Sequence, residues 1–183
     1  PFLCTPNMDA LANDGIRFTN VYCTSPVSGP SRASIVTGLM AREAGVEWND
    51  NSKLREGIQT VGDLLGENGY RTVWAGKWHI PEIYPQRSKD SVKYLHGFEL
   101  LPFWDAPNKH WLLGAETDPP LTDAVVSFLD SYDKREKPLF LAVSYHNPHD
   151  ICMYPRKVGW ETMSDSLLNL SPFGKYKLPE PMG

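Results

Sequence analysis

Helical and strand-like stretches of apolar residues alternate along the chain. Thr5 and Pro6 precede apolar positions at helical spacing, and Gly15 follows them. Thr60 and Gly69 bracket a second run of the same kind. We expect helices over 6–14, 30–37, 61–68 and about 122–132, and strands over 16–22, 70–75 and 139–143.

The last expected strand, 139–143, reads Leu-Phe-Leu-Ala-Val and is apolar on both of its faces. Strands of this kind that alternate with helices indicate a parallel sheet covered by helices on each side. The sequence therefore predicts an α/β fold with a mostly parallel central sheet. In such sheets, ligands bind beyond the carboxyl ends of the strands.

Composition allows one hydrophobic core of ordinary size. The chain has 183 residues, of which 41% are hydrophobic, so a single domain is expected. The net charge of -4 and the absence of a basic run argue against nucleic-acid and membrane-surface partners. The sequence contains no apolar run long enough to cross a bilayer and no recognisable signal peptide. An anionic ligand would therefore need a local positive pocket.

The three cysteines, Cys4, Cys23 and Cys152, form no Cys-x-x-Cys pair, and we expect them to be small buried residues. His146 and His149 lie just before Cys152, but a proline between them disrupts helical presentation and no second ligand pair follows. Structural zinc is therefore not expected.

Ser28 and Arg32 lie four residues apart at an expected helix start. Pro30 suits the first helical position and Gly38 suits the end, which would place Ser28 just before the helix. The unpaired amides and the positive end of the helix dipole favour a sulfate or phosphate there. Arg32, one turn on, adds a fork of donors, so the segment predicts a site for a tetrahedral anion.

Two more polar clusters come directly after expected strands. Lys77 and His79 follow the second strand, and His146 and His149 follow the third. The helix that contains Arg32 follows the first strand in the same way. Because the carboxyl ends of parallel strands meet at one edge, we expect the three clusters to converge on one pocket.

The segment around Ser28 resembles the signature of the sulfatase family, in which a Cys or Ser is followed by x-Pro-x-Arg and then by Thr-Gly. The matching residues are Ser28, Pro30, Arg32, Thr37 and Gly38. The family's Gly-Lys-Trp-His and Pro-His segments are matched in order at 76–79 and 148–149, and residues 5–20 are similar to the segment that precedes the signature. The resemblance implies an alkaline-phosphatase-like sandwich and a sulfuric ester hydrolase.

The resemblance also implies roles for single residues. In the family, a maturation enzyme oxidises the signature residue, here Ser28, to formylglycine, whose hydrated aldehyde supplies the attacking oxygen. Arg32 would orient and neutralise the modified side chain, and Lys77 would hold the sulfate oxygens. His79 would accept the hydroxyl proton, and His149 would contact the sulfate and the leaving group.

A divalent cation, usually calcium, lies beside formylglycine in the family. Hard cations need several oxygen ligands, yet the family's paired aspartates and its later Asp-Asn pair are both missing here. Asp9, Asp14 and Asp50 do not occupy the matching positions. The resemblance implies Ser28, as formylglycine, as a metal ligand, with the remaining ligands outside this chain.

We therefore expect an internal piece of a longer enzyme. Residues 1–183 would form one partial catalytic domain, incomplete at both ends, with a core over 1–150 and a loop-rich tail over 151–183. Alone, the chain is expected to be inactive and able to self-associate through exposed sheet edges.

The substrate and the source are encoded weakly. The aromatic residues between Tyr84 and Trp111 either stack on sugar faces or pack on the body of the protein. His146 either lines a sugar pocket or bonds to local backbone. A sulfated glycan or an aryl sulfate fits; a phosphate or phosphonate ester hydrolase and a non-catalytic anion- or glycan-binding module are the alternatives. The Ser-type signature implies a bacterial enzyme exported to the periplasm or secreted.

Overall fold

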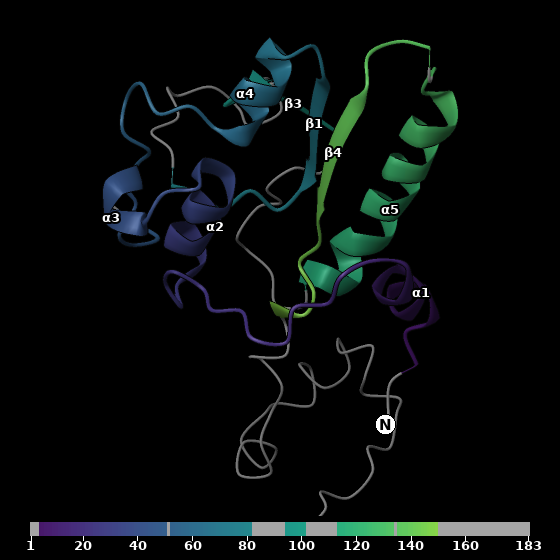
Figure 1. Cartoon of the computed structure of the whole chain (residues 1–183), viewed down its shortest axis with the longest axis horizontal. Coiled ribbons are helices and arrows are strands. Elements are labelled where there is room, and N and C mark those ends of the chain that lie inside the picture. Colours follow the sequence, from purple (N-terminus) through teal and green to yellow (C-terminus); the bar gives the residue numbers. More distant parts are fainter. Residues whose placement is uncertain (1–3, 51, 82–93, 102–112, 134, 150–183) are drawn as a thin grey trace, which may run out of the picture.

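The computed structural model describes residues 4–50, 52–81, 94–101, 113–133 and 135–149. This part of the chain contains a four-stranded sheet with helices on both of its faces (Figure 1). The helices are α1 (Pro6–Asp14), α2 (Ser28–Thr37), α3 (Ala41–Ala44), α4 (Val61–Glu67) and α5 (Leu113–Ser131). The strands are β1 (Arg71–Gly76), β2 (Tyr94–Leu95), β3 (Phe98–Leu100) and β4 (Leu139–Ser144). The expected tail over 151–183 lies outside the described residues.

The sheet has the order β2-β3-β1-β4 and is mostly parallel. β1 pairs in parallel with both β3 and β4, with Val73 opposite Leu141 on β4. Among the strands that the structure describes, only β2 and β3 pair in the antiparallel direction. The predicted α/β class is confirmed, and the carboxyl ends of β1 and β4 lie at the same edge of the sheet.

The side chains of β1 alternate between two cores, because successive residues of a strand point to opposite faces. Trp74 packs in the core that also contains Trp78 and residues of α2 and α3. Val73 and Ala75 pack in the other core, against Leu121 and its neighbours on α5. Figure 1 shows the same division, with α2, α3 and α4 on one side of the sheet and α5 on the other.

The helix expected over 61–68 is confirmed as α4. Thr60 caps it: its hydroxyl accepts from the N–H groups of Gly62 and Asp63, and the Asp63 carboxylate accepts the Thr60 N–H at 2.8 Å. This reciprocal arrangement is a capping box, in which each of Thr60 and Asp63 accepts the backbone N–H of the other through its side chain. The cap therefore fixes where α4 begins.

The strand expected over 16–22 is wrong. These residues form irregular structure, with Ile16 84% and Tyr22 88% exposed. A strand requires a neighbour for its backbone hydrogen bonds, and no described strand pairs with this segment. The helix α1 before it has the expected bounds, although none of its residues is buried.

A hairpin formed by β2 and β3 was not expected. His96 and Gly97 join the two strands with φ values of 47° and 77°, as a two-residue type I′ turn requires. Phe98, on β3, is fully buried and packs at 5.4 Å, centroid to centroid, from the ring of Trp74. Phe98 therefore packs on the body of the protein. The aromatic residues at 103, 104 and 111 lie outside the described residues.

Helix α5 begins at Leu113, nine residues before its expected start near Thr122. Pro119 and Pro120 lie inside it and remove two N–H donors from its backbone ladder. None of the described helices has the length and apolar character that crossing a membrane requires.

Candidate active site

Ser28 opens helix α2. The helix begins at Ser28 rather than at Pro30, because Val27 has the extended backbone of an N-cap and its carbonyl accepts the N–H of Ser31 at 3.0 Å. The expected start was two residues late, and Ser28 lies inside the first turn. The expected end is confirmed, since Gly38 has a φ of 70° and donates its N–H back to α2.

Ser28 contacts His79, which lies just beyond β1. Ser28 Oγ and His79 Nδ1 are 2.8 Å apart, a hydrogen-bond distance, and both residues are half-buried. His79 has a φ of 52°, a left-handed conformation that is uncommon for a residue with a Cβ. Such strain persists where the surrounding structure fixes it, often at functional sites. The fold thus sets an imidazole beside the candidate nucleophile.

Arg32 joins α2 to the ends of two strands. Its Nη1 donates to the carbonyl of Lys77 at 2.7 Å and to the hydroxyl of Ser144, the last residue of β4, at 2.9 Å. Lys77 also donates its N–H to the Ser144 carbonyl at 2.7 Å. Arg32 therefore holds the start of α2 at the carboxyl edge of the sheet. Sequence reasoning missed this positional role of Arg32 and missed Ser144.

Lys77 lies where the carboxyl ends of β1 and β4 approach each other closely. Lys77 is only 8% exposed, and it follows Gly76, whose φ is 87°. A Cβ on Gly76 would lie 2.2 Å from the carbonyl oxygen of Ser144. Only glycine tolerates both the conformation and the contact, so Gly76 is required for the strand ends to meet.

Asn49 holds the first turn of α2 from a distant loop. Its Oδ1 accepts the N–H of Gly29 at 2.8 Å. A Cβ on Gly29 would lie 2.9 Å from Cδ of Pro81 and 3.1 Å from Asn49 Oδ1. Because the first amides of a helix lack partners inside it, Asn49 satisfies one of them. Sequence reasoning missed Asn49, since a cap 20 residues away leaves no local pattern.

His146 is buried against α5. Its side chain is 5% exposed, and its Nδ1 lies 3.0 Å from Thr117 Oγ1 and 3.8 Å from Asp118 Oδ1. Thr117 was not among the expected partners, which were a sugar or the local backbone. His149 lies exposed in the same loop and donates its N–H to the His146 carbonyl at 2.9 Å.

The structure therefore brings four of the expected site residues together directly and leaves the fifth in an adjoining loop. Ser28, Arg32, Lys77 and His79 are linked by side-chain or backbone hydrogen bonds at the carboxyl end of β1. The backbone N–H of His149 donates to the carbonyl of His146 within its own loop. The catalytic roles of all five residues stay predictions.

A metal site is not formed by the described part of the chain. Those residues include no group of three or more His, Cys, Asp or Glu that could hold a metal ion. Cys4 and Cys23 are exposed free thiols, contrary to the expectation that they are buried, because they lie in the poorly packed segments around α1. Cys152 lies outside the described residues.

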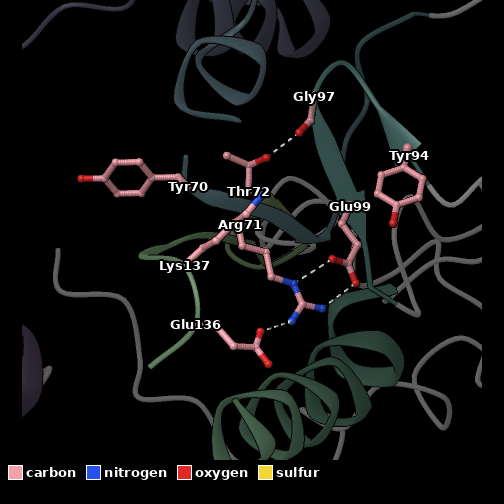
Figure 2. Close-up of a pocket in the computed structure, with 8 residues that line it drawn as sticks. All are labelled: Tyr70, Arg71, Thr72, Tyr94, Gly97, Glu99, Glu136 and Lys137. Atoms are coloured by element: carbon pink, nitrogen blue, oxygen red, sulfur yellow. Dashed lines mark hydrogen bonds and ion pairs between the residues drawn. The ribbon is translucent and has the colours of Figure 1, made fainter. Parts of the chain in front are cut away.

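A polar pocket lies at the other end of β1 (Figure 2). Arg71, the first residue of β1, donates to both carboxylate oxygens of Glu99 at 2.9 Å, and Glu136 lies 3.9 Å away. The hydrogen bond to Glu99 raises the pKa of Arg71. A strand rises by about 3.3 Å per residue, so six residues separate this pocket from Lys77 by roughly 20 Å. The pocket is not part of the Ser28 cluster.

Comparison with known proteins places the chain. A sequence model of the sulfatase family matches residues 1–163. The chain belongs to the sulfatase family. An N-acetylglucosamine-6-O-sulfatase from Bacteroides thetaiotaomicron is 38% identical over 161 residues, which cover 85% of this chain and 28% of that protein.

Solved structures agree with this membership. A sulfatase from Bacteroides thetaiotaomicron matches with a TM-score of 0.63 at 28% identity, over 84% of this chain and 32% of that one. A phosphonate monoester hydrolase of Agrobacterium radiobacter shares the fold with a TM-score of 0.62 at 22% identity, over 80% of this chain and 36% of that one. The fold is thus the alkaline-phosphatase-like fold of sulfatases. The chain spans about a third of the length of these relatives.

Proposed function

We propose that the intact protein containing this chain is a sulfatase that cleaves sulfate esters of glycans. Family membership supports the reaction class, and the N-acetylglucosamine-6-O-sulfatase relative supports a sulfated sugar as the substrate class. The observation that carries the proposal is the 2.8 Å contact between Ser28 Oγ and His79 Nδ1 at the start of α2.

Residue 28 is proposed as the nucleophile. Ser28, oxidised to formylglycine by a maturation enzyme, would supply a hydrated aldehyde. One of its hydroxyls would attack sulfur as the S–O bond to the sugar breaks and the sugar oxygen takes up a proton. The second hydroxyl would then lose its proton as the bond between the carbon and the sulfate oxygen breaks, which releases sulfate and re-forms the aldehyde. His79 Nδ1 lies within reach of the hydroxyl hydrogen on residue 28. An imidazole that carries its proton on Nε2 accepts this hydrogen at Nδ1, so we assign His79 as the general base.

Negative charge builds up on the sulfate oxygens as the ester bond breaks. Arg32 brings a positive charge to the edge where Ser28 lies, and we propose that the ammonium of Lys77 meets the sulfate there as well. The first turn of α2 adds the positive end of a helix of 10 residues. Preorganised donors of this kind stabilise the charge of a transition state without reorganisation.

Calcium is proposed to bind residue 28 together with further ligands that lie outside this chain. The described residues do not offer the cluster of oxygen ligands that calcium needs, so no step is assigned to the ion here. For the same reason the 183-residue chain alone is expected to be inactive. Self-association through exposed sheet edges and export from a bacterial cell also stay predictions.

The first test compares two serines of α2 in the intact protein expressed with its maturation system. The peptide that contains residue 28 should be about two mass units lighter than its sequence predicts, as conversion of serine to formylglycine requires. Ser28→Ala should abolish release of sulfate from a sulfated sugar. Ser31→Ala, three residues on in the same helix, should release sulfate at the wild-type rate. Unchanged sulfate release by Ser28→Ala would refute the assignment.

The same preparations separate the alternatives. An unmodified Ser28 together with hydrolysis of an aryl phosphate or a methylphosphonate ester would favour phosphoryl chemistry. The fold shared with the phosphonate hydrolase is compatible with that chemistry. Binding of a sulfated sugar without any turnover would favour a non-catalytic binding module.

A further inference from the structure

A carboxylate on α5 accepts two successive backbone N–H groups of the loop that follows β4. Asp118 Oδ1 accepts the N–H of His146 at 2.8 Å, and Asp118 Oδ2 accepts the N–H of Asn147 at 3.0 Å. Hydrogen bonds to an ionised acceptor are roughly twice as strong as neutral ones. Two bonds from one carboxylate to successive amides also fix the direction of the backbone between them.

Two further residues of α5 meet the same loop. Thr117 contacts the buried side chain of His146 at 3.0 Å. A Cβ on Gly114 would lie 2.5 Å from the side-chain amide of Asn147, so the loop packs directly on the helix there. Positions 114, 117 and 118 lie on one face of a helix, because residues three and four apart are neighbours on its surface. This face of α5 is therefore the surface on which the loop packs.

The other end of the loop is tied to the Ser28 cluster. Ser144 accepts a hydrogen bond from Arg32 through its hydroxyl at 2.9 Å and one from the Lys77 N–H through its carbonyl at 2.7 Å. At the far end, His149 donates its N–H to the carbonyl of His146. The segment 144–149 thus has one anchor at the candidate active site and one on α5, and His149 extends beyond the second anchor.

We propose that Asp118 is a positioning residue for His149. Its carboxylate holds the backbone of residues 146 and 147, and this backbone sets where the imidazole of His149 lies relative to the substrate. The proposal rests on the proposed sulfatase function, in which His149 contacts the leaving group. Misplacement of a reacting group by about 1 Å can cost on the order of 100-fold in rate, so a small shift of this loop is enough to matter.

The test uses the intact protein with Asp118→Asn, which keeps the size of the side chain and removes one of the two acceptor oxygens. Asp123→Asn is the matched control, because Asp123 is an exposed carboxylate on the same helix. Asp118→Glu tests rescue by a retained carboxylate. Hydrogen exchange of the amides at 146 and 147 is measured with the rates on two substrates, a sugar sulfate and 4-nitrophenyl sulfate.

We expect faster exchange at residues 146 and 147 in Asp118→Asn and wild-type exchange in Asp123→Asn. We also expect kcat on the sugar sulfate to fall about 10- to 100-fold at unchanged KM. The rate on 4-nitrophenyl sulfate should fall less, since 4-nitrophenolate is a good leaving group that depends little on a contact to His149. Asp118→Glu should recover part of both the protection and the rate.

A double variant decides whether Asp118 acts through His149. If it does, adding Asp118→Asn to His149→Ala should have little further effect, because the two changes remove the same contribution. Additive losses, or wild-type kcat in Asp118→Asn despite faster exchange, would overturn the proposal. If Asp118→Asn does not fold, wild-type kcat in a folded Asp118→Ser variant would overturn it equally.

Failure of the proposed function would look different. A wild-type protein with oxidised Ser28 that releases sulfate from neither substrate refutes the sulfatase assignment and the catalytic part of this proposal together. The exchange data then still decide whether Asp118 anchors the loop.

Discussion

The two ends of strand β1 both present an arginine, but they are built differently. At the amino end, Arg71 is held by a bidentate contact to Glu99 (Figure 2). Its guanidinium also lies over the rings of Phe128 and Tyr132, at 5.1 and 5.6 Å from their centroids. At the carboxyl end, Arg32 donates to the oxygens of strand ends beside Ser28. The amino end is an ordinary stabilising ion pair inside a pocket.

The difference shows why a pocket alone does not identify an active site. The pocket around Arg71 has positive and negative side chains that pair with one another. The carboxyl end instead combines a strained His79, a buried Lys77 and a glycine that permits no side chain. Local strain and costly burial persist when the surrounding structure enforces them, and functional sites are where they cluster. Changes at the carboxyl end should therefore affect activity, and changes at the amino end should affect stability alone.

The largest effect is expected for His79→Asn at the carboxyl end. Asparagine tolerates the left-handed backbone at this position, so the fold should be kept. Loss of the imidazole removes the proposed base, and sulfate release should fall about 100- to 10,000-fold. The measurement is kcat on a sugar sulfate, with thermal unfolding to show that the melting temperature is retained. Sulfate release within ten-fold of the wild-type rate would contradict the role of His79 and the contrast between the two ends of β1.

Gly76→Ala should have the next largest effect. The new Cβ would meet the Ser144 carbonyl oxygen at 2.2 Å in a backbone with a φ of 87°. We expect the free energy of unfolding to fall by about 3 kcal/mol or more. Gly57→Ala is the control, because its φ is 82° and nothing lies within 4 Å of its Cβ. Strain alone should cost about 1–2 kcal/mol there, and equal losses in urea unfolding would contradict the role of the close contact.

Arg71→Gln at the amino end should have the smallest effect. The ion pair is partly exposed, so its loss should lower the free energy of unfolding by about 1 kcal/mol and leave kcat per folded molecule unchanged. Arg135→Gln, which removes an exposed arginine paired with Asp133, is the control and should change neither.

The effect of Arg71→Gln should not depend on pH between 5 and 9. Its pKa is raised by Glu99, so its contribution to stability is present below the pKa of the unfolded chain and is lost only as pH rises through the still higher folded value. Both values lie well above this pH range. A ten-fold loss of kcat in this variant would show that the amino end takes part in catalysis.

Local signals in the sequence predicted many of the elements well. The helix start after Thr60, the apolar run of β4 and the glycine that ends α2 depend on residues near in sequence, and all three are confirmed. The strand over 16–22 failed because its apolar residues find no neighbouring strand in the described part of the chain. The start of α5 was missed because prolines usually mark the end of a helix, whereas Pro119 and Pro120 lie inside it.

The sequence by itself determined the family, the α/β class and the residue types of the site, because signature spacing and short-range periodicity are written in neighbouring residues. Only the tertiary structure decided that Asn49 caps α2, that Arg32 ties the ends of two strands and that Asp118 seats the loop of His149. These contacts join residues 20 to 112 positions apart. Their partners are chosen by how packed elements meet in space, and no local pattern along the chain records that choice.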